Sequence, residues 1–504
     1  MPQPRQYFFA PVLVLSAVGF GVLPLLWFSY AQGGRPQLDT YTWRILGFTL
    51  LQASLSTMFS ILLGIPVARA LIRQQLPGLG LLRMVFAVPL SLPVIVALLG
   101  ITTIYGNSGL LGGTFPLYGL SGIVLVHVFF NLPLAARLLA DGLENVPPES
   151  HRLAAQLNFN DWQVWQHVDW PVLRTLLPRL SALIFLLCAA SFVIVLTLGG
   201  PSATTLEVAI YHALRLDFDV SRALTLSMLQ VALSILLVWG AGRLAYASPL
   251  LPSLGTTAWR QDGKRRSTML LDVTALGLAA LVVLPPLVAV VLAGVTQVHL
   301  TRLVMQALAT SLALGIASSA IVLALAWPLA QLQYRGGKTG LIAQFCGIAG
   351  LIVPPAVMAT GWFLAVRTMG GSPWLAAFLV ICLNALMALP FIMTTLAPAV
   401  MRIHAMHDKL CLSFGIEDWE RFRNFDFPVL RPVLGQVLLM GFVLSLGDLT
   451  AITLLGSGGL VTLPSLVAQQ MGNYRSAEAG GTALLLAVLC FSLTVWAHRL
   501  GDRR

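Results

Sequence analysis

Twelve apolar runs of about 20 residues recur along the chain, separated by shorter polar stretches. A helix of about 20 apolar residues crosses the ~30 Å hydrocarbon layer of a bilayer. Continuous runs of this length predict membrane-spanning helices, whereas a β-barrel would show short alternating strands. The predicted spans lie near residues 8–30, 46–70, 84–105, 119–140, 179–200, 223–246, 270–294, 307–331, 341–366, 374–397, 433–455 and 479–500.

Composition supports a membrane protein. Apolar residues make up 57% of the 504-residue chain and charged residues only 10%, against roughly 25% charged residues in soluble domains. A soluble enzyme, a secreted disulfide scaffold and a disordered protein are therefore excluded.

The five cysteines and eight histidines show no paired-ligand spacing, so no metal site is predicted. The first apolar run exceeds the usual signal-peptide core, which favours an uncleaved span.

Lys and Arg residues indicate the orientation. With the N-terminus inside, 23 of the 30 fall on the cytoplasmic side, which predicts that both termini are cytoplasmic. The net charge of +11 is thus mostly a topology signal. It does not indicate nucleic-acid binding.

The chain contains an internal repeat. Residues 158–174 and 415–431, related by a shift of 257, are identical at seven of seventeen positions, where about one match is expected by chance. We predict a first six-helix unit at 1–246, a cytoplasmic linker at 247–268 and a second six-helix unit at 269–504. Six helices per unit give the two halves the same orientation in the membrane.

The repeated stretch is polar and lies on the predicted cytoplasmic side. Its pattern predicts a helix, a turn with positive φ at Asn158 or Gly415, and a second short helix that ends before Pro171 or Pro428. A loop that is kept in duplicate suggests a surface recognised by a partner. The alternative is a pair of amphipathic helices on the bilayer surface, which the interleaved acids disfavour.

These residues resemble the "EAA" coupling loop of ABC-importer permeases, which docks into a cleft of the ATPase subunit. The resemblance rests on Leu153-Ala154-Ala155…Asn158…Pro171 and Leu410…Gly415…Pro428. It places coupling loops at about 145–178 and 402–432. Arg152 and Lys409 stand where the family has an acid, so that acid's role is not carried over. The implied coupling residues are Ala154, Ala155, Asn158, Asp161, Trp162, Pro171, Leu410, Gly415, Asp418, Trp419 and Pro428.

Two fused six-helix units resemble the ferric-iron and thiamine branches of this family. Stretches such as 203–205, 209–211, 446–448 and 472–476 are similar to the thiamine branch. The resemblance implies an all-α permease of the bacterial inner membrane, two copies of an ATPase subunit, a periplasmic solute-binding protein and a thiamine-like substrate. ATP-Mg would be used by the partner, with no cofactor in this chain. A ferric-iron permease, an ion-coupled secondary transporter and a non-transporting scaffold remain alternatives.

The chain carries no nucleotide-binding motif. Gly336-Gly337-Lys338-Thr339 ends like a phosphate-binding loop, but Leu332 stands where that motif needs glycine. A cytoplasmic turn between two membrane helices is expected there instead. ATP hydrolysis is accordingly assigned to a separate subunit.

Asp448 is the most conspicuous acid inside an apolar run, and charges within a membrane need a reason. It either faces a cationic substrate in the pathway, with Trp362 or Tyr474 as possible aromatic neighbours, or caps a broken helix. His127 is expected to form an interhelical hydrogen bond. Prolines are expected to open two helices, at Pro93 and at Pro354-Pro355, each followed by a glycine at a matching distance, Gly100 and Gly361. Simple kinking for packing is the alternative.

Overall fold

The computed structural model describes residues 7–31, 38–74, 76–245, 266–367, 373–414, 418–456 and 459–501, and all regular elements within them are helical. The first half contains α1 (Phe9–Ala31), α2 (Thr40–Arg73), α3 (Leu79–Ser91), α4 (Val94–Tyr105), α5 (Leu120–Glu144), α6 (Pro148–Gln156), α7 (Asp161–Val164), the π-helical turn η2 (Trp165–Asp169), α8 (Trp170–Ala189), α9 (Val193–Leu198), α10 (Leu206–Arg215) and α11 (Val220–Ala245). The second half contains α12 (Arg266–Gly294), α13 (Arg302–Arg335), α14 (Gly337–Gly347), α15 (Ala349–Ile352), α16 (Pro355–Arg367), α17 (Pro373–Ser413), α18 (Asp418–Arg421), the π-helical turn η3 (Phe422–Asp426), α19 (Phe427–Leu446), α20 (Thr450–Leu455), α21 (Leu463–Gly472) and α22 (Ser476–Gly501).

Within the described residues, ten helices are long and apolar enough to cross a membrane, and the bent pair α3–α4 adds an eleventh candidate. The all-α membrane architecture is therefore confirmed. The predicted span 341–366 is not one helix but is divided among α14, α15 and α16. The cause is local at Pro354, because proline cannot donate the backbone hydrogen bond that would continue α15 into α16.

The repeat extends to the helix boundaries. The series α8, α9 and α10 recurs 257 residues later as α19, α20 and α21. The two halves also share a hydrogen bond at the start of a short helix. Leu206 N at the start of α10 donates to Thr49 Oγ1 of α2 at 3.0 Å. Leu463 N at the start of α21 donates to Ser311 Oγ of α13 at 2.8 Å. The unit boundaries stay a prediction, since most of the linker lies outside the described residues; α12 begins at Arg266, inside the predicted linker.

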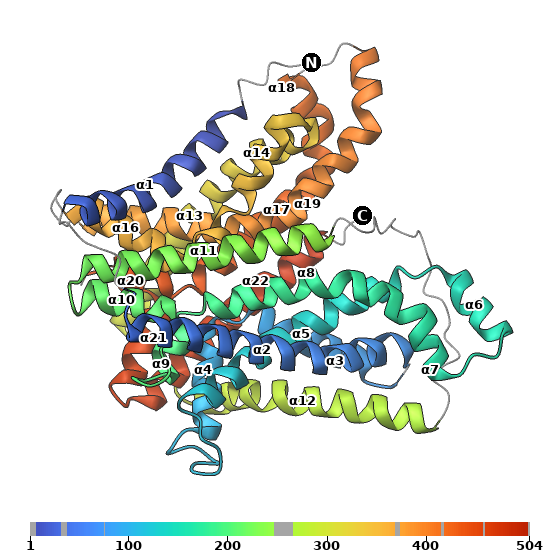
Figure 1. Ribbon diagram of the computed structural model, residues 1–504, viewed down its shortest axis with the longest axis horizontal. Coiled ribbons are helices and arrows are strands. Elements are labelled where there is room, and N and C mark those ends of the chain that lie inside the picture. The colour runs from blue at the N-terminus through green and yellow to red at the C-terminus, as the bar shows by residue number, and fades with distance from the viewer. Residues whose placement is uncertain are drawn as a thin grey trace.

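The first helix of each half packs against the other half. Helix α1 lies along α16, and α12 lies along α4, on opposite sides of the bundle (Figure 1). Both crossings need a glycine. A Cβ on Gly361 would lie 1.5 Å from Gly21 O, and a Cβ on Gly100 would lie 2.3 Å from Pro286 O. Gly100 and Gly361, which follow the prolines at matching distances in the two halves, therefore allow these close helix crossings between the halves.

Candidate functional site

The first predicted coupling loop connects α5 to α8 and begins with α6. The backbone then turns at Asn158, whose φ is +53°. An Asn side chain tolerates this left-handed conformation better than most residues. Asn160 next caps α7 through a reciprocal pair of hydrogen bonds with Gln163, which satisfies free backbone N–H groups at the helix start. The predicted helix–turn–helix start of the loop, and its positive φ, are confirmed.

This loop, with α6 and α7, lies at one end of the molecule (Figure 1) and exposes large apolar side chains. Leu153, Leu157 and Trp162 are 55%, 57% and 68% exposed. Ala154 faces the other way and is buried in a small cluster beneath the loop with Val164. Exposed apolar side chains held on a packed base are typical of a surface that another protein covers. We call Leu153, Leu157 and Trp162 the first coupling surface.

The second coupling loop is only partly described. Gly415 lies outside the described residues, so its predicted turn stays a prediction. Leu410 belongs to α17, and Asp418 and Trp419 belong to α18. Pro428 lies in the first turn of α19 and is exposed.

The prediction that the second short helix ends before the proline is wrong in both loops. The chain stays helical through Pro171, passing from α7 through η2 directly into α8. Trp170 N bonds to Trp165 O, and Phe427 N bonds to Phe422 O, five residues back in each case. A π-helical turn shifts the hydrogen-bond register and leaves room for a residue that has no N–H. Proline therefore stands in the first turn of each following span.

A buried aspartate at the end of each π-helical turn anchors the loop. In the first half Asp169 pairs with Arg69 of α2 at 2.9 Å, and the Arg69 guanidinium lies over the Trp165 ring. In the second half the matched Asp426 lies 3.5 Å from Arg421 Nε. The internal repeat places these two aspartates at equivalent positions, but the sequence does not show which cations they contact.

Arg421 has a further partner in Asp408 of α17. Burial disfavours its charged form, but the hydrogen bond to Asp408 and the nearby Asp426 carboxylate outweigh burial and raise the pKa of Arg421 above its usual value. Arg421 therefore stays charged and ties α18 to α17. The described parts of the two loops have matching helices and π-helical turns, but different cations anchor them.

Helix α12 joins the first loop to the second half. Thr268 donates a hydrogen bond to the Asp161 carboxylate. One turn further along, Asp272 forms a buried ion pair with Arg73 of α2, with Nε to Oδ2 at 2.9 Å, and accepts a hydrogen bond from Gln74 at 2.6 Å. Asp272 lies inside the predicted span 270–294, so Asp448 is not the only acid within the apolar runs. The sequence shows Asp272 but not its pairing, because Arg73 is 199 residues away.

Asp448 lies in a break between α19 and α20. Its carboxylate accepts hydrogen bonds from Thr450 N at 3.1 Å and Ala451 N at 2.9 Å. This geometry matches the helix-capping reading of the residue. The first half breaks at the same place, between α8 and α9, where Ser191 stands.

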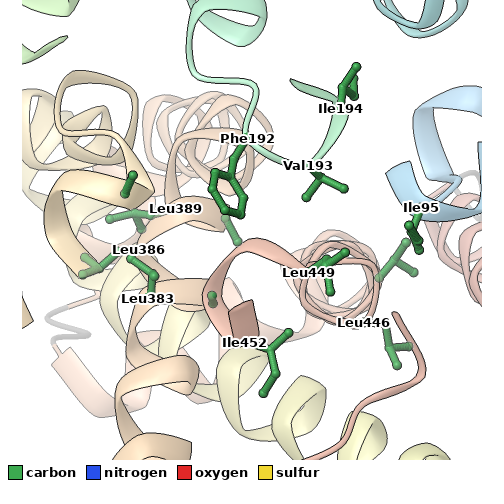
Figure 2. Packing of buried hydrophobic residues seen from close by; sticks show 14 of the residues in the cluster. Ile95, Phe192, Val193, Ile194, Leu383, Leu386, Leu389, Leu446, Leu449 and Ile452 are labelled. Atoms are coloured by element: carbon green, nitrogen blue, oxygen red, sulfur yellow. The ribbon is translucent and has the colours of Figure 1, made fainter. Parts of the chain in front are cut away.

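The breaks bring the halves together. A Cβ on Gly447 would lie 3.2 Å from a ring carbon of Pro93, where α3 gives way to α4. Phe192, which lies in the break of the first half, belongs to one buried cluster with Leu386 and Leu449 of the second half (Figure 2). The expected opening at Pro93 is confirmed. A pathway between the halves would pass these breaks.

The remaining candidates have separate roles. His127 Nδ1 lies 3.0 Å from Ser56 Oγ, which confirms an interhelical hydrogen bond between α5 and α2. Trp362 is buried and donates to Ala17 O of α1, and Tyr474 is 95% exposed in the turn before α22. Neither aromatic is placed as a partner of Asp448. Gly336 forms the expected turn between α13 and α14.

Comparison with known proteins decides the family. Residues 323–504 match the family described as "Binding-protein-dependent transport system inner membrane component". The thiamine transport system permease protein ThiP of Brucella melitensis is 39% identical over 97% of this chain and 94% of its own length. The chain belongs to the thiamine transport system permease family. The Escherichia coli K12 protein of that name is 40% identical over 97% of this chain and 95% of its own, and the Haemophilus influenzae one is 33% identical over 99% and 97%.

The alignments with the ThiP relatives cover 97% of this chain and therefore extend over both halves. The family description also makes this chain a multi-pass component of an inner membrane that works with a binding protein. Both coupling loops and both broken spans lie inside the aligned length. The anchors Arg69, Asp272 and Arg421 are the functional candidates that sequence reasoning missed.

Proposed function

We propose that this chain is the translocation subunit of an ATP-driven importer that carries thiamine, thiamine phosphates or both into the cytoplasm. The observation that carries the proposal is the nearly full-length likeness to thiamine permeases of three bacterial genera, at 39–40% identity. The paired coupling loops add a mechanism. A periplasmic solute-binding protein would deliver the substrate at the face opposite these loops.

The motor in this proposal is a separate ATPase present in two copies, one on each coupling loop. The exposed apolar side chains of the first coupling surface would fill a cleft in one copy. Both termini and both loops would then be cytoplasmic, in agreement with the distribution of Lys and Arg. The anchors at Asp169 and Asp426 would transmit movement of the docked loops to α8 and α19, because each aspartate directly precedes one of these helices.

The direct test is reconstitution. The chain, its ATPase subunit and a periplasmic thiamine-binding protein are assembled in proteoliposomes, and uptake of labelled thiamine is measured with and without ATP. We expect uptake only when all three proteins and ATP are present. Uptake driven by a proton or sodium gradient without ATP would contradict the proposal.

The proposed stoichiometry gives a separate prediction. Native mass spectrometry of the purified complex should show one copy of this chain with two ATPase subunits. The purified chain alone should hydrolyse no ATP, because hydrolysis needs a nucleotide-binding domain that the proposal places in the partner. Hydrolysis that copurifies with the isolated chain through a second purification step, at rates near those of the complex, would refute this division of labour.

We also propose that Asp448 borders the substrate pathway, since its break meets Pro93 of the other half. Asp448→Asn should lower uptake severalfold by removing the negative charge, while Asn still caps α20 and assembly with the ATPase is kept. Asp448→Glu should recover more uptake than Asn. Wild-type uptake by Asp448→Asn would leave Asp448 with its capping role alone.

A further inference from the structure

Glu207, the second residue of α10, is an acid that no role described above uses. Its side chain is completely buried. One carboxylate oxygen accepts a long hydrogen bond, 3.3 Å, from Ala356 N at the start of α16, and the other oxygen has no hydrogen-bond partner among the described residues. Within that part of the chain, no Lys, Arg or His forms an ion pair with it. A buried acid with so few partners is costly and needs a reason.

Helix α10 places this acid at the contact between the halves. Ala356 belongs to the second half. At the other end of α10, Arg215 donates to Leu454 O of α20 at 2.7 Å and its guanidinium lies over the Phe363 ring. Helix α10 therefore bridges to the second half at both ends. The matched helix α21 carries proline and glycine at the corresponding positions, Pro464 and Gly472, so the acid is unique to the first half's copy.

An aromatic side chain shares the helix face of Glu207. Tyr211 follows one turn after Glu207, which puts both residues on one face of α10. The Tyr211 ring packs edge-on against Phe192, with centroids 5.4 Å apart and an interplanar angle of 73°. Phe192 itself lies in the cluster where the broken spans meet (Figure 2). An acid together with aromatic rings is the combination that recognises organic cations.

We propose that Glu207 is the counter-charge for an organic cation that passes between the halves, with the Tyr211 and Phe192 rings beside it. The inference rests on the proposed function, because thiamine carries a permanently positive thiazolium ring. Asp448 would border the same pathway, but both of its carboxylate oxygens already accept hydrogen bonds at the start of α20, whereas Glu207 has one oxygen without a hydrogen-bond partner among the described residues. The weak bond to Ala356 is the contact that would break when α10 and α16 separate, and the carboxylate would then face the cation.

The experiment compares Glu207→Gln with Glu207→Asp in the reconstituted complex with its ATPase and binding protein. Gln keeps the size of Glu and can still accept from Ala356 N, whereas Asp keeps the charge on a shorter side chain. We expect Glu207→Gln to lose about tenfold or more of thiamine uptake, as does removal of one partner of a desolvated charge pair. Glu207→Asp should retain more uptake than Gln. The matched control is Glu478→Gln, which removes an exposed acid 3.7 Å from Arg475 and should leave uptake unchanged.

Complex assembly is measured separately from uptake. Each variant is checked for monodisperse complex with the ATPase, so that a folding defect is not mistaken for a lost charge. Uptake by Glu207→Gln equal to wild type, or a ranking of Gln above Asp among assembled complexes, would overturn the inference and make Glu207 a hydrogen-bonding contact between halves. Failure of the wild-type complex to import thiamine would instead overturn the proposed function, and the cation named here with it.

A second substrate tests whether Glu207 responds to the charge of the ring. The neutral thiophene isostere of the thiazolium ring keeps the shape of thiamine without its charge. The ratio of wild-type uptake to Glu207→Gln uptake should be large for thiamine and near one for the isostere, because only thiamine carries the positive charge. The same binding protein delivers each substrate to both permeases, so differences in delivery cancel in each ratio. Equal ratios for the two substrates would mean that Glu207 does not sense the charge.

Discussion

Replacing Asn158 with valine should lower ATP-driven transport by about tenfold or more while the chain still folds in the membrane. Asn158 adopts φ +53°, and a left-handed conformation costs an L-residue roughly 1–2 kcal/mol, with β-branched side chains the least tolerant. A shift of 1.4 kcal/mol changes an equilibrium tenfold. The turn would open, and α6, which carries Leu153, would no longer be held in place relative to α7, which carries Trp162. Uptake and the affinity of the ATPase subunit for the chain measure the effect.

The control for this prediction is Asn158→Gly, which takes positive φ freely and should transport like wild type. The repeat extends the prediction to Gly415→Val, which should uncouple the second loop in the same way. Normal coupling by Asn158→Val would show that the turn does not position the first coupling surface. Normal coupling by Gly415→Val alone would show that the two loops turn differently.

Local chemistry made these loops predictable from the sequence. A turn at Asn158 depends on one residue's backbone preferences, and the repeat doubled the signal by presenting the same spacing twice. The breaks at Pro93 and Pro354 were predictable for the same reason, because proline acts on its own helix. The π-helical turns were missed, since a proline at Pro171 reads equally well as the end of one helix or the first turn of the next.

The anchors could not be predicted, because they join residues that are distant in sequence. Asp169 and Asp426 match each other in the repeat, but one is neutralised by Arg69 from α2 and the other by Arg421 from its own loop. No spacing rule chooses between such partners. Glu207 was hidden differently: it lies outside the apolar runs, and only the packing of α10 against α16 shows that it is buried.

The largest effect on stability is expected at the ion pair between Arg73 and Asp272. Both side chains are 4% exposed. Removing one partner of a buried pair typically costs 3–5 kcal/mol, because the other charge remains buried and unpaired. Asp272→Ala should therefore greatly reduce the yield of folded, monodisperse chain and lower its thermal unfolding temperature in detergent. Glu478→Ala, at the exposed pair with Arg475, should have little effect.

The double variant Arg73→Leu with Asp272→Leu distinguishes charge from packing. An apolar pair of similar volume is often as stable as the buried ions it replaces, so the double variant should recover much of the folded yield lost by Asp272→Ala. Recovery would assign the defect to an unpaired charge at the contact between α2 and α12. It would not restore transport if this contact also links the halves during coupling, because Asp161 on the first loop is bonded to Thr268 one turn earlier on the same helix. A double variant that folds and transports normally would limit the ion pair to a structural role. A double variant that folds but does not transport would show that α12 carries movement from the ATPase to the membrane helices.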